Sequence, residues 1–188
     1  MKPDESSPAG PGPVLPFSVR PLTPEDAIAI CHWRYPGQYA FYDYDPGDWR
    51  SMLAPEANYV AVAGADGAVA GFLTFGANAR VSGAQAAGLY ASEALDIGLG
   101  LRPDLTGQGY GRAFLASALA WAEWRYNPST IRLVVATFNT RAIRAYERAG
   151  FVAGPAFTSP VAGREVPFVL MTRPVSRENA GRESMPGR

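Results

Sequence analysis

The chain has almost no cysteine or histidine, with Cys31 and His32 as the single residue of each type. One cysteine cannot form an internal disulfide, and one cysteine with one histidine cannot supply the ligands of a Cys/His zinc site. Adjacent side chains on a helix diverge, so we expect no catalytic Cys–His pair between these two residues. The sequence therefore excludes disulfide scaffolds and Cys/His zinc sites, and it predicts no bound metal.

The chain also lacks net charge and long apolar runs. Its 17 basic and 17 acidic residues cancel, which removes any compositional argument for binding nucleic acid or a membrane surface. Residues 1–10, MKPDESSPAG, carry acids and prolines where a signal peptide would be apolar, and no later segment approaches the length that spans a bilayer. We therefore expect a soluble, cytoplasmic protein that binds a small molecule or a peptide.

A length of 188 residues suits one domain with its own hydrophobic core. Residues 1–16 include five prolines and little to bury, and the C-terminal segment is polar, charged and without apolar periodicity. We predict a single domain over residues 17–173, with flexible tails at residues 1–16 and 174–188.

Strand-like and helix-like patterns alternate between these tails. Thr23 can cap a helix that starts at Pro24, and the turn ADGA at residues 65–68 predicts a β-hairpin. An antiparallel front half followed by a strand–helix–strand crossover is typical of an α/β or α+β fold with helices on both faces of one sheet. The predicted strands are residues 17–20, 58–64, 69–76, 94–101, 131–138, 152–159 and 165–172, and the later helices are residues 109–125 and 140–149.

Three glycines alternate with other residues in LGLRPDLTGQGYGRAFL, residues 99–115, between a predicted strand and a predicted helix. Such a loop can hold a phosphate, because glycines allow close approach and the first helical turn has unpaired N–H groups. A P-loop would need Gly-Lys-Ser/Thr, whereas Arg112 and Ala113 follow Gly111. A dinucleotide fingerprint would need G-x-G-x-x-G and a later acid, but the next strand ends in ATFN. The alternative interpretation, a glycine-rich turn that serves only close packing of the strand and the helix, is not excluded by these residues.

Two blocks, residues 102–114 (RPDLTGQGYGRAF) and residues 135–151 (VATFNTRAIRAYERAGF), together resemble the GNAT superfamily of acetyl-CoA-dependent N-acetyltransferases. The first is similar to the Gln/Arg-x-x-Gly-x-Gly/Ala motif, with Thr106 where Gln or Arg is usual. The second is similar to the segment N-x-x-A-x-x-x-Y-x-x-x-G-F. The resemblance extends over residues 17–172 and implies a mixed, mostly antiparallel sheet of about six to seven strands, splayed at its centre.

The resemblance implies that acetyl-CoA binds as the co-substrate. Its pantetheine arm would pair with exposed strand backbone, and its pyrophosphate would accept hydrogen bonds from the backbone amides of the glycine loop. Asn139 is placed to cap the following helix, and the resemblance adds a contact to the CoA arm. The implied binding residues are Leu99, Gly100, Leu101, Thr106, Gly107, Gln108, Gly109, Tyr110, Gly111, Arg112 and Asn139.

Three residues are candidates for the chemistry. Tyr146 shares a helical face with apolar residues; it is either a core tyrosine or, as the resemblance implies, the proton donor to the departing thiolate of CoA. The attacking amine must lose a proton, so a carboxylate or a water chain is expected near the thioester. Asp96 is the first candidate base and Glu93 the second, with a salt-bridged strand acid as the alternative for Asp96.

The loop QYAFYDYDPGDW, residues 38–49, interleaves aromatic and acidic residues. In the resemblance this region lines the acceptor side, where aromatics and acids would suit a cationic amine. The alternative is a packed loop in which Asp48 caps a short helix toward Leu53. The residues concerned are Tyr39, Phe41, Tyr42, Tyr44, Trp49, Asp43, Asp45 and Asp48.

The sequence thus predicts an acetyl-CoA-dependent N-acetyltransferase. The acetyl group would move to a primary amine of a small molecule or a peptide, by direct attack in a ternary complex. An alternative is a non-catalytic acyl-CoA-binding regulatory module, and a nicotinamide-dependent dehydrogenase is a third reading. The expected partner is the amine substrate, with no nucleic acid and no membrane, and a homodimer is conceivable.

Overall fold

The computed structural model describes residues 17–176. The predicted tail at residues 1–16 lies outside the described residues, and so does the second tail from residue 177 onward. The predicted start of that second tail is too early, because the last strand runs to Pro174 and the backbone N–H of Val175 donates to the carbonyl of Ser129 at 2.9 Å.

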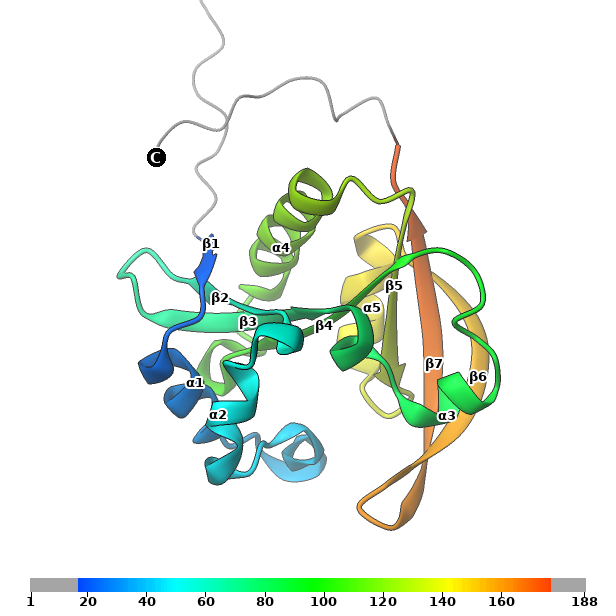
Figure 1. The fold of residues 1–188 in the computed structure, drawn as a ribbon, viewed down its shortest axis with the longest axis horizontal. Coiled ribbons are helices and arrows are strands. Elements are labelled where there is room, and N and C mark those ends of the chain that lie inside the picture. The colour runs from blue at the N-terminus through cyan, green and yellow to red at the C-terminus, as the bar shows by residue number, and fades with distance from the viewer. Residues whose placement is uncertain (1–16, 177–188) are drawn as a thin grey trace, which may run out of the picture.

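Seven strands form one sheet in the order β1-β2-β3-β4-β5-β7-β6, in which only β4 and β5 run parallel (Figure 1). The strands are β1 (Ser18–Pro21), β2 (Tyr59–Ala63), β3 (Val69–Phe75), β4 (Leu95–Leu101), β5 (Thr130–Ala136), β6 (Val152–Val161) and β7 (Arg164–Pro174). The helices are α1 (Pro24–Cys31), α2 (Trp49–Met52), α3 (Ser82–Ala86), α4 (Gly111–Tyr126) and α5 (Thr140–Arg148). The predicted fold class, with its mixed, mostly antiparallel sheet, is confirmed.

Local sequence signals explain where several elements begin and turn. Thr23 caps α1 and forms a capping box with Asp26, while Pro24 occupies the first helical turn. Gly67 has a φ of +78° in the turn between β2 and β3, as an Asp-Gly hairpin requires. No helix within residues 17–176 is long and apolar enough to cross a membrane.

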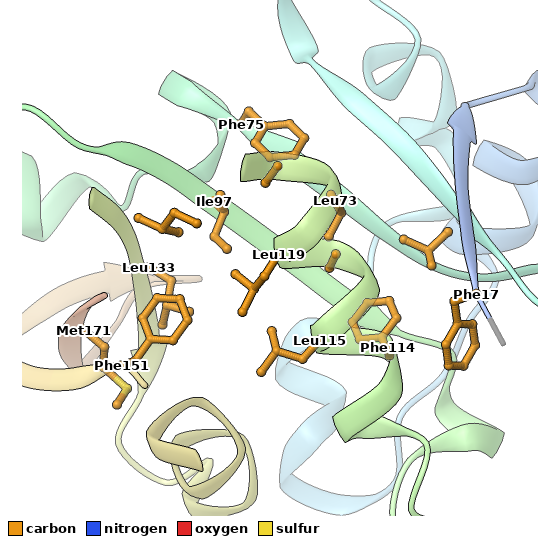
Figure 2. Packing of buried hydrophobic residues seen from close by; sticks show 14 of the residues in the cluster. Phe17, Leu73, Phe75, Ile97, Phe114, Leu115, Leu119, Leu133, Phe151 and Met171 are labelled. Atoms are coloured by element: carbon orange, nitrogen blue, oxygen red, sulfur yellow. The ribbon is translucent and has the colours of Figure 1, made fainter. Parts of the chain in front are cut away.

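Helices cover both faces of the sheet, with α4 on one side and α1 and α2 on the other (Figure 1). On the α4 face, Phe114 and Leu115 pack against strand residues such as Leu73 and Ile97 (Figure 2). Apolar residues of α5 also join this core. On the other face, Cys31 of α1 and neighbouring apolar residues pack against Phe72 of β3. The sheet therefore separates two hydrophobic cores, one on each face.

The sheet is splayed between β4 and β5. These strands pair only at Leu95 with Ile131 and at Asp96 with Arg132, although β4 continues for five more residues. Beyond this short pairing, β4 stays bonded to β3, and β5 stays bonded to β7. The predicted central splay is thus present, and it leaves one side of residues 97–101 without a partner strand.

Candidate active site

A cavity of about 480 Å³ fills the gap between the splayed strands. It passes through the sheet, because its walls include Phe114 and Leu115 from the α4 side and Tyr44 and Phe72 from the α1 side. A cavity of this size suits a small-molecule ligand. The backbone and side chains that it exposes therefore define the candidate site.

The β4 edge presents backbone groups to this cavity. The N–H of Arg102 donates to Ala70 in β3 at 2.8 Å. Because peptide groups alternate in direction along a strand, those of Leu99 and Leu101 point away from β3, into the gap. The Tyr35 hydroxyl donates to the Leu101 carbonyl at 2.8 Å, so one of these groups already has a protein partner. The strand edge at Leu99 remains for a ligand.

The glycine loop offers a run of unused backbone donors at the end of the cavity. None of the N–H groups from Gly107 to Ala113 donates to an acceptor within residues 17–176. Gly107 and Gly109 have φ values of +77° and +87°, a conformation that glycine adopts without strain. Helix α4 begins at Gly111, two residues later than predicted. Unused N–H groups at a helix start can bind an anion.

The predicted loop residues divide into two groups by position. Thr106, Gly107 and Gly111 line the cavity, together with the strand residues 99–101. The remaining predicted residues, Gln108, Gly109, Tyr110 and Arg112, are exposed outside it. The Thr106 hydroxyl donates to the Pro103 carbonyl at 2.7 Å, so this hydroxyl stabilises the turn before the glycine loop.

Arg141 is a residue that sequence reasoning missed. It is the second residue of α5 and lines the cavity, with its Nη1 3.6 Å from the position that a Cβ on Gly107 would take. Its guanidinium stacks on the Tyr39 ring at 4.8 Å and donates to no acceptor in the described part of the chain. Helical spacing alone had pointed only to the apolar face of α5, on which Tyr146 lies. The structure adds a positive charge beside the unused loop amides.

Asn139 and Tyr146 both line the cavity from the α5 side. Asn139 caps α5 as predicted, since its Oδ1 accepts from the N–H of Ala142 at 3.2 Å. Its Nδ2 donates to the Tyr42 hydroxyl at 3.2 Å, which connects α5 to the aromatic loop. Burial raises the pKa of Tyr146 far above its ordinary value, and nearby Tyr42 adds to the rise. Burial therefore favours the neutral Tyr146 hydroxyl, which is a hydrogen-bond donor.

Asp96 is not placed as a base. Its side chain is only 3% exposed and is absent from the cavity wall. The Asp96 Oδ1 accepts from Arg132 Nε at 2.5 Å, and its Oδ2 accepts from Arg132 Nη2 at 3.1 Å and from Arg80 Nε at 2.7 Å. Both oxygens are thus engaged by guanidinium groups, away from the cavity wall. The geometry supports the alternative of a salt-bridged strand acid.

The other predicted acids also lie away from the cavity. Glu93 is exposed in the loop before β4. Asp43 accepts from the backbone N–H of Tyr35 at 2.9 Å, and Asp45 accepts from that of Gly47 at 2.7 Å. Helix α2 follows Asp48, but the Asp48 side chain makes no capping hydrogen bond. These carboxylates therefore support loop turns or face solvent.

The aromatic residues of the same loop do reach the cavity. The predicted Tyr39, Phe41, Tyr42 and Tyr44 line it, whereas Trp49 packs in the α1 core. Other rings that sequence reasoning did not assign complete this aromatic wall; they are Tyr35, Phe72 and Phe168. Their positions depend on three separate strands and loops, so no local pattern could have grouped them.

Cys31 and His32 are separate, as the sequence predicts. Cys31 is fully buried with its Sγ 3.6 Å from Met52 Sδ, and burial raises the pKa of the thiol. His32 is exposed, and its Nδ1 lies 2.8 Å from the Ile28 carbonyl. In the described part of the chain no three His, Cys, Asp or Glu residues are grouped as a metal site would need.

Comparisons with known proteins agree with this geometry. A family model described as the acetyltransferase (GNAT) family matches residues 26–151, more than half of the chain. A spermidine N-acetyltransferase SpeG chimera from Vibrio cholerae and hSSAT superposes with a TM-score of 0.61 at 18% identity, covering 85% of this chain and 95% of that one. A structure provisionally assigned as a phosphinothricin N-acetyltransferase gives a TM-score of 0.63 at 17% identity, covering 86% and 99%. No curated protein sequence matches the chain. At these identities the structures confirm the fold alone.

Proposed function

We propose that this chain, which belongs to the acetyltransferase (GNAT) family, transfers an acetyl group from acetyl-CoA to the primary amine of a small molecule or a peptide. The family implies acetyl-CoA as the co-substrate. The observation that carries the proposal is the open gap between β4 and β5, which has unpaired strand backbone along one side and unused loop amides at its end.

These two sets of backbone groups fit the two polar parts of acetyl-CoA. The amides of a pantetheine arm match the free backbone groups of Leu99 on the β4 edge, as an added strand would. A pyrophosphate matches the N–H groups of residues 108–112 at the positive end of the α4 dipole. Arg141 would add a charged contact beside this loop. Having Thr106 where Gln or Arg is usual should weaken pyrophosphate binding little, because most of these contacts come from the backbone.

The chemistry follows from the groups that surround the gap. When bound, acetyl-CoA supplies an activated thioester, and we infer that a neutral amine attacks it directly in a ternary complex. A backbone N–H of β4, such as that of Leu99, would polarise the thioester carbonyl. Tyr146 would donate to the sulfur that leaves. Its raised pKa favours a donated hydrogen bond over a lasting phenolate, which an apolar site would disfavour.

The proton of the attacking amine needs another route. No carboxylate or imidazole among residues 17–176 lines the cavity. Neither Asp96 nor Glu93 is therefore retained as the base. We infer that the amine binds in its neutral form and that its proton leaves to solvent, so that kcat/KM should rise with pH up to the pKa of the amine.

Calorimetry with acetyl-CoA, followed by a CoA release assay over a panel of amines, tests this function. The expected result is binding of acetyl-CoA and release of free CoA that depends on one class of amine. Binding without release for every amine would instead indicate an acyl-CoA-binding module. A chain that does not bind acetyl-CoA would contradict both readings.

A further inference from the structure

The cavity wall carries positive charge and no negative charge. Its charged lining residues within residues 17–176 are Arg80 and Arg141. The acids of the 38–49 loop, which the sequence placed on the acceptor side, accept from nearby backbone N–H groups, at Tyr35 and Gly47, or face solvent. With Arg141 assigned to the pyrophosphate, a polycationic acceptor would meet Arg80 and no carboxylate on the cavity wall. The wall therefore disfavours polyamines, whereas an anionic group would find a partner.

Arg80 has an unused half of its guanidinium. Its Nε donates to Asp96 at 2.7 Å, but its two terminal nitrogens donate to no acceptor in the described part of the chain. Its side chain is 37% exposed, in contrast to Arg132, which is 1% exposed and binds both oxygens of the same carboxylate. Asp96 carries one negative charge and lies between the two positive charges of Arg80 and Arg132. The cluster therefore has a net charge of +1, on the side where Arg80 lines the cavity. Two free terminal nitrogens form the fork that a carboxylate binds best.

The position of Arg80 is close to the part of β4 assigned to the reaction. Ala79, its chain neighbour, lies 3.7 Å from the place that a Cβ on Gly98 would take. Gly98 directly precedes Leu99, whose backbone faces the gap, and all four residues line the cavity. Arg80 stacks on Tyr90 at 4.9 Å, which fixes its direction of approach. An anion held by Arg80 would thus lie on the acceptor side of the thioester position.

The aromatic wall of the same cavity supplies an apolar surface. Phe41 contacts Phe168 with ring centroids 6.1 Å apart, and Tyr44 contacts Phe72 at 5.8 Å. These rings come from both flanks of the gap, so they can enclose a hydrophobic side chain of an acceptor.

From this combination we propose that the acceptor is an α-amino acid with an apolar, preferably aromatic, side chain. Arg80 would bind its carboxylate, the aromatic wall would bury its side chain, and its amine would face the β4 edge. The inference rests on the proposed function, because it names the substrate class of the same site.

A matched pair of amines isolates the carboxylate. L-Phenylalanine and 2-phenylethylamine share the ring and the amine and differ in the carboxylate, and spermidine represents the polycations. In CoA release assays we expect kcat/KM for L-phenylalanine to exceed that for 2-phenylethylamine at least tenfold, with spermidine the poorest of the three. Equal or better use of 2-phenylethylamine or spermidine would overturn the proposal.

Substitution of Arg80 tests the contact itself. Arg80→Gln should lower kcat/KM for L-phenylalanine at least tenfold and leave that for 2-phenylethylamine within about twofold, while Arg80→Lys should restore part of the loss. Arg125→Gln, at an exposed arginine near the end of α4, is the matched control and should change neither. An equal loss for both amines in Arg80→Gln would show a merely structural role and would overturn the proposal.

The failure of the underlying function has a different signature. Acetyl-CoA binding measured by calorimetry should be unchanged in Arg80→Gln, which also confirms that the variant is folded. If the unmodified protein binds acetyl-CoA but releases no CoA with any amine, the proposed function fails and the amino-acid inference fails with it. If it acetylates amines without regard to a carboxylate, only the inference fails.

Discussion

The two ends of the cavity are built from different parts of the chain. On the α4 and α5 side, most of the groups that we propose to bind acetyl-CoA are backbone groups, at residues 99–101 and 107–113. On the α1 and α3 side, the groups that we propose to bind the amine are side chains, namely the aromatic wall and Arg80. Backbone groups recognise a ligand whatever the side chains are, so the first half can be shared by a family. The second half can change residue by residue, and we expect it to set which amine is used.

The largest expected effect tests whether Asp96 belongs to the framework of the acceptor half. Asp96→Asn leaves the buried Arg132 without its counter-charge, so the free energy of unfolding should fall by roughly 3 kcal/mol. Urea denaturation measures this loss. Asp104→Asn, at an exposed pair with Arg102, is the control and should cost less than about 1 kcal/mol. A stable Asp96→Asn protein without activity would make Asp96 a base after all.

The next largest effect tests Tyr146 as the hydrogen-bond donor to the leaving sulfur of CoA. Tyr146→Phe should lower kcat about 100-fold and leave KM for acetyl-CoA within about twofold, because only the donated hydrogen bond is lost. The loss should be the same from about pH 7 to about pH 9.5, since the raised pKa keeps the hydroxyl protonated throughout. Tyr126→Phe, on the last turn of α4, provides a control. Unchanged turnover at every pH would remove Tyr146 from the mechanism.

A smaller effect should be confined to the backbone half. Gly109→Ala places a side chain at a φ of +87°, which costs about 1–2 kcal/mol and shifts the loop amides, so KM for acetyl-CoA should rise about tenfold. Gly67→Ala, at a φ of +78° in the distant β2–β3 turn, should cost similar stability and leave KM unchanged. Steady-state kinetics with the amine held saturating measures the difference. A similar KM in both variants would argue against the loop as the pyrophosphate site.

The smallest effect should fall on the side-chain half. Tyr35→Phe removes the hydrogen bond to the Leu101 carbonyl, which anchors the aromatic wall to β4. Such a bond contributes about 1 kcal/mol, so KM for the amine should rise roughly threefold to fivefold. KM for acetyl-CoA should move less. If acetyl-CoA binding suffers more than amine binding, the two halves are not separable in the way described.

Much of the fold could be predicted because its signals are local. Thr23 and Pro24 mark the start of α1, Gly67 marks the hairpin turn, and Asn139 caps α5. Each of these depends on the chemistry of a few consecutive residues. The short helix α3 had no such signal, since Ser82–Ala86 is too short for apolar periodicity.

The same reasoning explains the uneven prediction of the site. The glycine loop and Tyr146 could be found because their spacing along the chain is distinctive. The roles of Arg80 and Asp96 depend on Arg132, which lies 36 residues beyond Asp96 and meets it only through the parallel pairing of β4 and β5. Strand alternation correctly separated the Asp96 side chain from the apolar face of β4. It could not show that Arg132 of β5 is the residue that Asp96 contacts. Acceptor specificity is therefore the part of this molecule that needs the three-dimensional structure.

Asn139 uses both ends of one amide, with its oxygen on the first turn of α5 and its nitrogen on the Tyr42 hydroxyl. A displacement of α5 on binding of the co-substrate would therefore reach the aromatic wall through this one side chain. If acetyl-CoA shifts α5 in this way, the affinities for acetyl-CoA and for the amine would be coupled, and thermodynamic linkage would require each ligand to change the affinity of the other by the same factor.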